Sequence, residues 1–112
     1  MSHVRPTEAR TLRDVFAPML ALLAKLVEQM REGHRGNEEL EDLRALLERL
    51  PLTTEEFGLA TTRMGNAHRY VKAREQGAAR WELKALRGQL QRQLQLQTAG
   101  YAPRRRGFGV RS

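Results

Sequence analysis

Apolar residues in the first thirty positions recur alternately four and three residues apart, and this spacing constrains the fold more than any other feature. The series consists of Leu12, Phe16, Met19, Leu23, Leu26 and Met30. Such an alternation follows one face of an α-helix, so the segment is predicted to be an amphipathic helix. Pro18 interrupts the pattern and predicts a kink, or a new helix start near Ala17. Gly33 is expected to end the helix.

A second helix is predicted between Asn37, which is a suitable N-cap residue, and Pro51, which cannot continue a helix. Its apolar face consists of Leu40, Leu43, Leu47 and Leu50. Acidic residues fill much of the rest, so this helix is expected to balance basic segments elsewhere in the chain.

The third helix has the clearest start signal in the sequence. Thr53 and Glu56 have the spacing of a capping box, and Leu52 and Phe57 occupy the two positions of a hydrophobic staple. The apolar face then continues through Ala60, Met64, Ala67 and Val71. Because this face keeps its phase across Gly65, the helix is predicted to be continuous there.

The helical phase changes by one residue near Gly77. The next apolar face consists of Ala79, Leu83, Leu86, Leu90 and Leu94. We therefore predict a turn near Gln76 and Gly77, followed by a fourth helix from about Ala78 to Gln97. The alternative is one bent helix of roughly 44 residues, about 66 Å long, which would need a partner chain to cover its apolar face.

These four segments predict an all-α fold, either a small four-helix bundle or a pair of helical hairpins, completed by the chain itself or by dimerisation. Residues 1–97 form the expected helical domain and residues 98–112 a flexible basic tail. The chain has no cysteine, which fits a cytoplasmic location. The longest apolar run, Val15 to Ala24, has ten residues and is too short to span a membrane.

Positive charge is concentrated in the second half of the chain. Residues 1–52 carry eight Lys and Arg against nine Asp and Glu, whereas residues 53–112 carry twelve against four. This asymmetry predicts an anionic partner, with nucleic acid, either DNA or RNA, as the first expectation. The alternative is a basic surface that only keeps the protein soluble.

The predicted nucleic-acid contacts lie on helical faces and in the tail. They are Arg63, Arg69, Lys72, Arg74, Arg80, Lys84, Arg87, Arg104, Arg105 and Arg106. Arginine side chains bind phosphate oxygens through a planar fork of donors, so such contacts would depend weakly on base sequence.

Trp81 lies on the opposite side of the fourth helix from its leucines, in line with Ala78, Ala85 and Gly88. A bulky side chain beside small ones predicts that another helix docks there, from this chain or from a second copy. The predicted oligomer or partner interface comprises Trp81, Leu83, Ala85, Leu86 and Leu90.

Motifs for catalysis, metals or cofactors are sparse. No Gly-rich phosphate loop and no paired metal-ligand spacing is present, so we expect no enzyme, no metal, no cofactor and no small-molecule substrate. Residues 54–76 can also be interpreted as a helix-turn-helix with its turn at Gly65 and Asn66.

The segment from Arg63 to His68 resembles the Arg-x4-His spacing of the HEPN ribonucleases, although Met64 replaces the usual polar residue after the arginine. The resemblance implies a helical bundle, often dimeric, in which Arg63 and His68 bind and activate RNA. The sequence as a whole favours a non-enzymatic helical protein that binds nucleic acid through its basic C-terminal half. A helical adaptor for other proteins is the main alternative, and the HEPN-like ribonuclease is the third.

Overall fold

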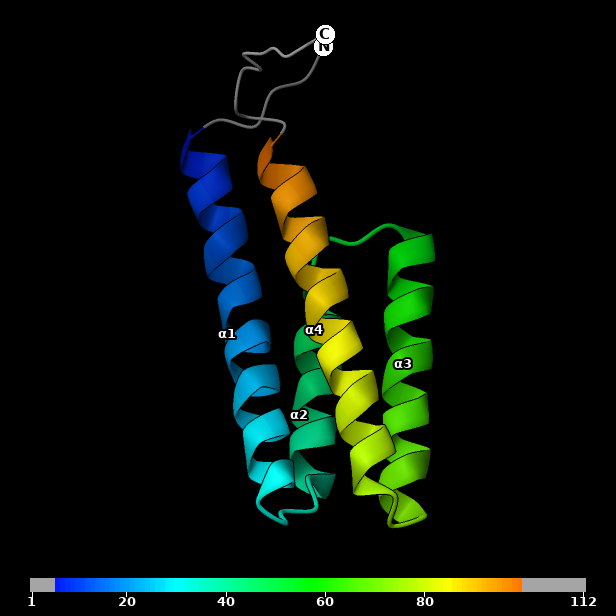
Figure 1. The fold of residues 1–112 in the computed structure, drawn as a ribbon. Coiled ribbons are helices and arrows are strands. Elements are labelled where there is room, and N and C mark those ends of the chain that lie inside the picture. The colour runs from blue at the N-terminus through cyan, green and yellow to red at the C-terminus, as the bar shows by residue number, and fades with distance from the viewer. Residues whose placement is uncertain (1–5, 100–112) are drawn as a thin grey trace, which may run out of the picture.

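A computed structural model describes residues 6–99, which form four α-helices. They are α1 (Pro6–Arg31), α2 (Asn37–Leu47), α3 (Thr54–Lys72) and α4 (Gln76–Ala99). Successive helices run antiparallel, and each of the four contacts two neighbours (Figure 1). The helix α1 packs on α2 and α4, and α3 packs on the same two helices, so α1 and α3 lie on a diagonal. The prediction of a small all-α bundle is confirmed.

The core contains the apolar faces that the spacing predicted. Its fully buried large side chains come from α1, α2 and α4, namely Phe16, Met19, Leu23, Leu26, Leu43, Leu47, Leu83, Leu86 and Leu90. The α3 helix adds Ala60, Met64, Ala67 and Val71. Leu12, Phe57 and Leu94, at the ends of their faces, are only partly buried. The α1 helix is continuous through Pro18, so no new helix starts near Ala17.

The connection between α1 and α2 depends on two glycines. Gly33 has φ of 106° and ends α1, while Gly36 has φ of 85° and is the N-cap of α2. A Cβ atom on Gly36 would lie 2.9 Å from Cδ1 of Leu26. The prediction that Asn37 caps α2 is therefore wrong, because Asn37 is already the first helical residue and no side chain caps this end.

The capping box at the start of α3 is confirmed. The Glu56 amide donates to Oγ1 of Thr53 at 3.1 Å, and the Thr53 amide donates to Oε1 of Glu56 at 2.9 Å. The α3 helix then runs without interruption past Gly65. This continuity rules out the predicted alternative of a helix-turn-helix, which needs a turn at that position.

The turn between α3 and α4 lies at Ala73 to Glu75, slightly before the predicted position. Arg74 has φ of 61°, in the left-handed region. The Glu75 amide donates to the Tyr70 carbonyl and the Arg74 amide donates to the Val71 carbonyl. This is the Schellman arrangement, in which glycine is the usual left-handed residue. Two separate helices are thus confirmed, and the single bent helix is wrong.

Two glutamines in the second half of α4 donate hydrogen bonds to the first turn of α3 and to the connection before it. Gln89 Nε2 donates to the Glu56 carbonyl at 3.1 Å, and Gln97 Nε2 donates to the Pro51 carbonyl at 3.0 Å. Gln93 lies between them on the same side of α4 and is 8% exposed. These contacts give the glutamine-rich end of the sequence a structural role.

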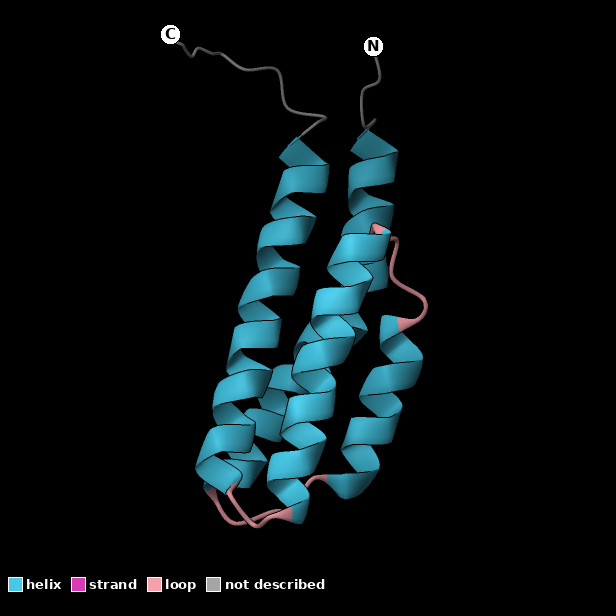
Figure 2. Ribbon diagram, turned by 90° about the vertical axis from the view of Figure 1, so that its right-hand side faces the viewer, coloured by secondary structure: helices cyan, strands magenta, loops and turns pink. Residues whose placement is uncertain are grey.

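The α2 helix has only 11 residues, against 26 in α1 and 24 in α4. Because α2 is short, a connection without helical structure continues along the bundle from the end of α2 to the start of α3, as Figure 2 shows. Within residues 6–99, no helix has the length and apolar composition needed to cross a membrane.

Candidate nucleic-acid interface

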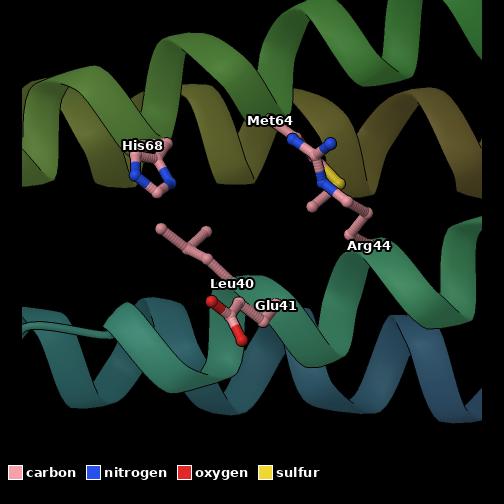
Figure 3. A pocket seen from close by; sticks show the side chains of 5 residues that line it. All are labelled: Leu40, Glu41, Arg44, Met64 and His68. Atoms are coloured by element: carbon pink, nitrogen blue, oxygen red, sulfur yellow. The ribbon is translucent and has the colours of Figure 1, made fainter.

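The surface between α2 and α3 contains two adjoining hollows, of about 400 Å³ and about 430 Å³. Glu41 and His68 line both hollows, so together they form one groove, which we call the α2–α3 groove. Its lining residues are Arg35, Asn37, Leu40, Glu41, Arg44, Met64, His68, Val71, Lys72 and Arg74. Figure 3 shows part of it, with side chains from the two helices facing each other across the gap.

Helical spacing explains this lining. His68 follows Met64 by four residues, and Val71 and Lys72 follow His68 by three and four, so all four lie toward one side of α3. On α2, Leu40 belongs to the buried face, and Glu41 and Arg44 lie exposed at its edge. Leu40, Met64 and Val71 are between 4% and 6% exposed and form an apolar floor.

Four cations stand along the groove. Arg35 and Arg44 belong to the α2 side, and Lys72 and Arg74 belong to the α3 side. All four are exposed, and none forms an ion pair with another residue of the 6–99 range. Glu41 is the single carboxylate in the lining, so the groove carries an excess of positive charge at neutral pH.

The other predicted cations of α3 contact their own bundle. Arg63 Nη1 lies 3.4 Å from Oε1 of Glu82, a carboxylate of α4 that is 7% exposed. Asn66 Nδ2 donates to the other Glu82 oxygen at 3.3 Å. Arg69 is exposed and donates to the side-chain oxygen of Asn66. Arg63 therefore balances the buried charge of Glu82 within its own bundle.

The predicted cations of α4 lie on another side of the molecule. Arg80 Nε donates to the Val27 carbonyl of α1 at 3.1 Å, so this arginine joins two helices. Lys84 and Arg87 are exposed. The pKa of Glu28 on α1 is lowered, first by its hydrogen bond and ion pair with Arg31 and to a smaller extent by Arg80 and Lys84. Arg104, Arg105 and Arg106 lie outside the described residues.

The predicted interface residues of α4 divide into two groups. Leu83, Leu86 and Leu90 have no exposed surface and lie in the core of their own chain. Trp81 is 63% exposed, and Ala85 is half-buried. No helix among residues 6–99 covers Trp81, so the neighbouring helix that the sequence predicted there is not part of this described bundle.

Arg63 and His68, the pair implied by the HEPN resemblance, have different neighbours. Arg63 faces Glu82 on α4, whereas His68 lines the groove toward α2. The two side chains are not brought together within the chain. No cluster of potential metal ligands occurs among residues 6–99.

The sequence interpretation missed Arg35, Asn37, Glu41 and Arg44, which come from the half of the chain that carries no net positive charge. Arg44 follows the buried Leu40 by one helical turn, and this spacing was the available signal that it borders a neighbouring helix.

No protein-family model, curated protein or solved structure matches this chain at a significant level. Its fold class is that of a small antiparallel four-helix bundle, and its chemistry rests on the residues described above.

Proposed function

We propose that this protein binds nucleic acid, and that the α2–α3 groove contacts the phosphates. The observation that carries the proposal is the set of four exposed cations, Arg35, Arg44, Lys72 and Arg74, on both sides of one concave surface without a carboxylate partner within the described bundle. Because these cations have no ion pair within the described bundle, no ion pair has to be broken when a phosphate binds. Arginine also provides a fork of donors that matches phosphate oxygens.

The groove supports this function better than the α4 surface does. Arg80 already donates to a backbone carbonyl. The charge of Lys84 helps to lower the pKa of Glu28, so Lys84 interacts with a carboxylate of the same bundle. Lys84 and Arg87 remain available as secondary contacts. Because phosphate contacts dominate, binding is expected to show weak base specificity and strong salt dependence.

The test measures binding of the full chain to fluorescent RNA and to duplex DNA over a salt series. Each phosphate neutralised contributes a slope of about −0.7 for single strands or about −0.9 for duplex DNA in a plot of log K against log salt. The groove variant Arg44→Gln with Lys72→Gln should lower the magnitude of the slope by about 1.4 to 1.8, corresponding to two lost contacts.

The matched control is Arg10→Gln with Arg13→Gln, which removes the same charge from exposed positions of α1. A general effect of net charge would lower the salt slope equally in both variants, whereas a groove contact lowers it only in the Arg44→Gln with Lys72→Gln variant. Absence of binding at low salt, or an equal decrease of the slope in the two variants, would refute the proposal.

A second candidate is an adaptor that recruits another protein. The exposure of Trp81, at 63%, favours it, because tryptophan is enriched at the centres of protein interfaces. Light scattering and co-purification with wild-type and Trp81→Ala chains would test it. A defined complex that requires Trp81, together with no affinity for nucleic acid, would favour the adaptor.

A further inference from the structure

The lining of the α2–α3 groove combines three kinds of side chain. Its floor is apolar, with Leu40, Met64 and Val71. The hydrogen-bonding side chains of Asn37, Glu41 and His68 also line it, and the cations stand on both sides. A ligand that matches all three must combine a flat apolar part, hydrogen-bonding edges and negative charge.

An unpaired nucleotide strand has this combination. Its bases are free to lay their faces on apolar side chains and to present their edges, while its phosphates reach cations on either side. A duplex hides the base faces in its stack and offers mainly phosphates and groove edges. The α3 side of the groove, from Met64 to Lys72, spans about 12 Å, so the groove holds a short stretch of strand.

Glu41 distinguishes this ligand from a plain polyanion. Its carboxylate lines both hollows and repels a phosphate or an acidic peptide. A carboxylate does accept hydrogen bonds from the exocyclic amino groups of cytosine and adenine. At the corresponding position uracil offers a carbonyl oxygen, which faces the carboxylate of Glu41 as one acceptor against another and leaves only the ring N3–H as a donor.

From these contacts we infer that the α2–α3 groove is a site for unpaired nucleotides, with a base that carries an exocyclic amino group beside Glu41. This inference rests on the proposed function and specifies its ligand class. The cations supply affinity, the floor receives the base face, and Glu41 selects the base.

The experiment compares cytosine, adenine and uracil RNA octamers, an eight-base-pair RNA duplex and a glutamate octapeptide at one salt concentration. The full chain should bind the cytosine and adenine octamers about tenfold more tightly than the uracil octamer, which corresponds to the discrimination of one good base contact. It should bind the duplex and the peptide more weakly than all three.

The diagnostic variant is Glu41→Gln, at an exposed position where folding is not at risk. The amide offers both a donor and an acceptor and removes a negative charge. The preference should therefore fall to about twofold or less, while affinity for the uracil octamer rises. A variant that lost affinity for every octamer equally would contradict a selecting role for Glu41.

The proposed function and the inferred ligand class are refuted by different outcomes. If no oligonucleotide binds, the proposed function fails together with this inference. If nucleic acid binds through the groove but the duplex or the acidic peptide binds as tightly as the octamers, only the inference is overturned. The same holds if Glu41→Gln leaves the order of bases unchanged.

Discussion

Replacing Arg74 by glycine should make the bundle more stable and its groove less able to bind nucleic acid. Arg74 is the only non-glycine residue between residues 6 and 99 with positive φ, at 61°. A residue with a Cβ atom loses about 1–2 kcal/mol in the left-handed region. Glycine removes this cost but adds about 0.4–1 kcal/mol of chain entropy to the unfolded state. The difference between these two terms should raise the free energy of unfolding of the Arg74→Gly variant by roughly 0.5–1 kcal/mol.

The two connections at this end of the bundle provide an internal comparison. Gly33 ends α1 with the same pair of hydrogen bonds, from the His34 amide to the Gln29 carbonyl and from the Gly33 amide to the Met30 carbonyl. No atom lies within 4 Å of a Cβ added at Gly33, so Gly33→Ala tests the backbone conformation alone. That variant should lose stability by an amount similar to what Arg74→Gly gains.

Thermal unfolding measures the first effect. A gain of this size raises Tm by about 2–6 °C in a domain of this length. Arg74→Ala separates conformation from charge, because alanine keeps the unfavourable φ and removes only the guanidinium. Both Arg74 variants should weaken RNA binding by about one phosphate contact. Equal stabilisation by Arg74→Ala and Arg74→Gly, or undiminished RNA binding by Arg74→Gly, would contradict this prediction.

Three further predictions concern the scaffold. Thr53→Ala removes one half of the capping box and should lower the free energy of unfolding by about 1 kcal/mol in a denaturant titration, whereas Thr53→Ser should restore most of it. Glu82→Ala leaves the mostly buried Arg63 without its partner and should lower the free energy of unfolding by about 3 kcal/mol. The double variant Arg63→Met with Glu82→Leu should recover most of this loss. An equal loss of stability in the single and the double variant would show that the pair matters only through packing. The pKa of Glu39 lies below its ordinary value of 4.5 because its own backbone amide, and then His34, donate to the carboxylate. A carboxylate with a lowered pKa stabilises the fold above its unfolded pKa and loses that contribution as the pH falls through the folded value. Stability should thus decline below about pH 4.5, less steeply in Glu39→Gln; an identical acid profile in that variant would contradict the assignment.

The apolar spacing predicted the core because core packing in a bundle follows local periodicity. The four predicted faces supply every buried apolar side chain described, and the Thr53 capping box was readable from four residues. The α3–α4 turn was placed late because Gly77 looked like the natural residue for it. Hydrogen bonds from Arg74 and Glu75 end α3 earlier, and nothing in the sequence marks an arginine as left-handed.

The groove was harder to predict because its two sides come from segments far apart in the chain. Arg44 and Lys72 approach one surface only because α2 packs on α3. Counting charges by halves assigned Arg44 to an acidic scaffold helix. The same counting predicted that Arg63 contacts nucleic acid, although the buried Glu82 of α4 lies beside it.

The fold therefore divides the basic residues by what they contact rather than by where they occur in sequence. Arg63 and Arg80 hold α4 to its two neighbours, one through a carboxylate and the other through a backbone carbonyl. Arg44 and Lys72 have no such role within the described bundle and stand on opposite sides of one groove. Arg74 stands beside Lys72 in a backbone conformation that glycine would adopt more easily. A cation kept at a conformational cost, next to cations without partners, is the pattern expected where binding competes with stability.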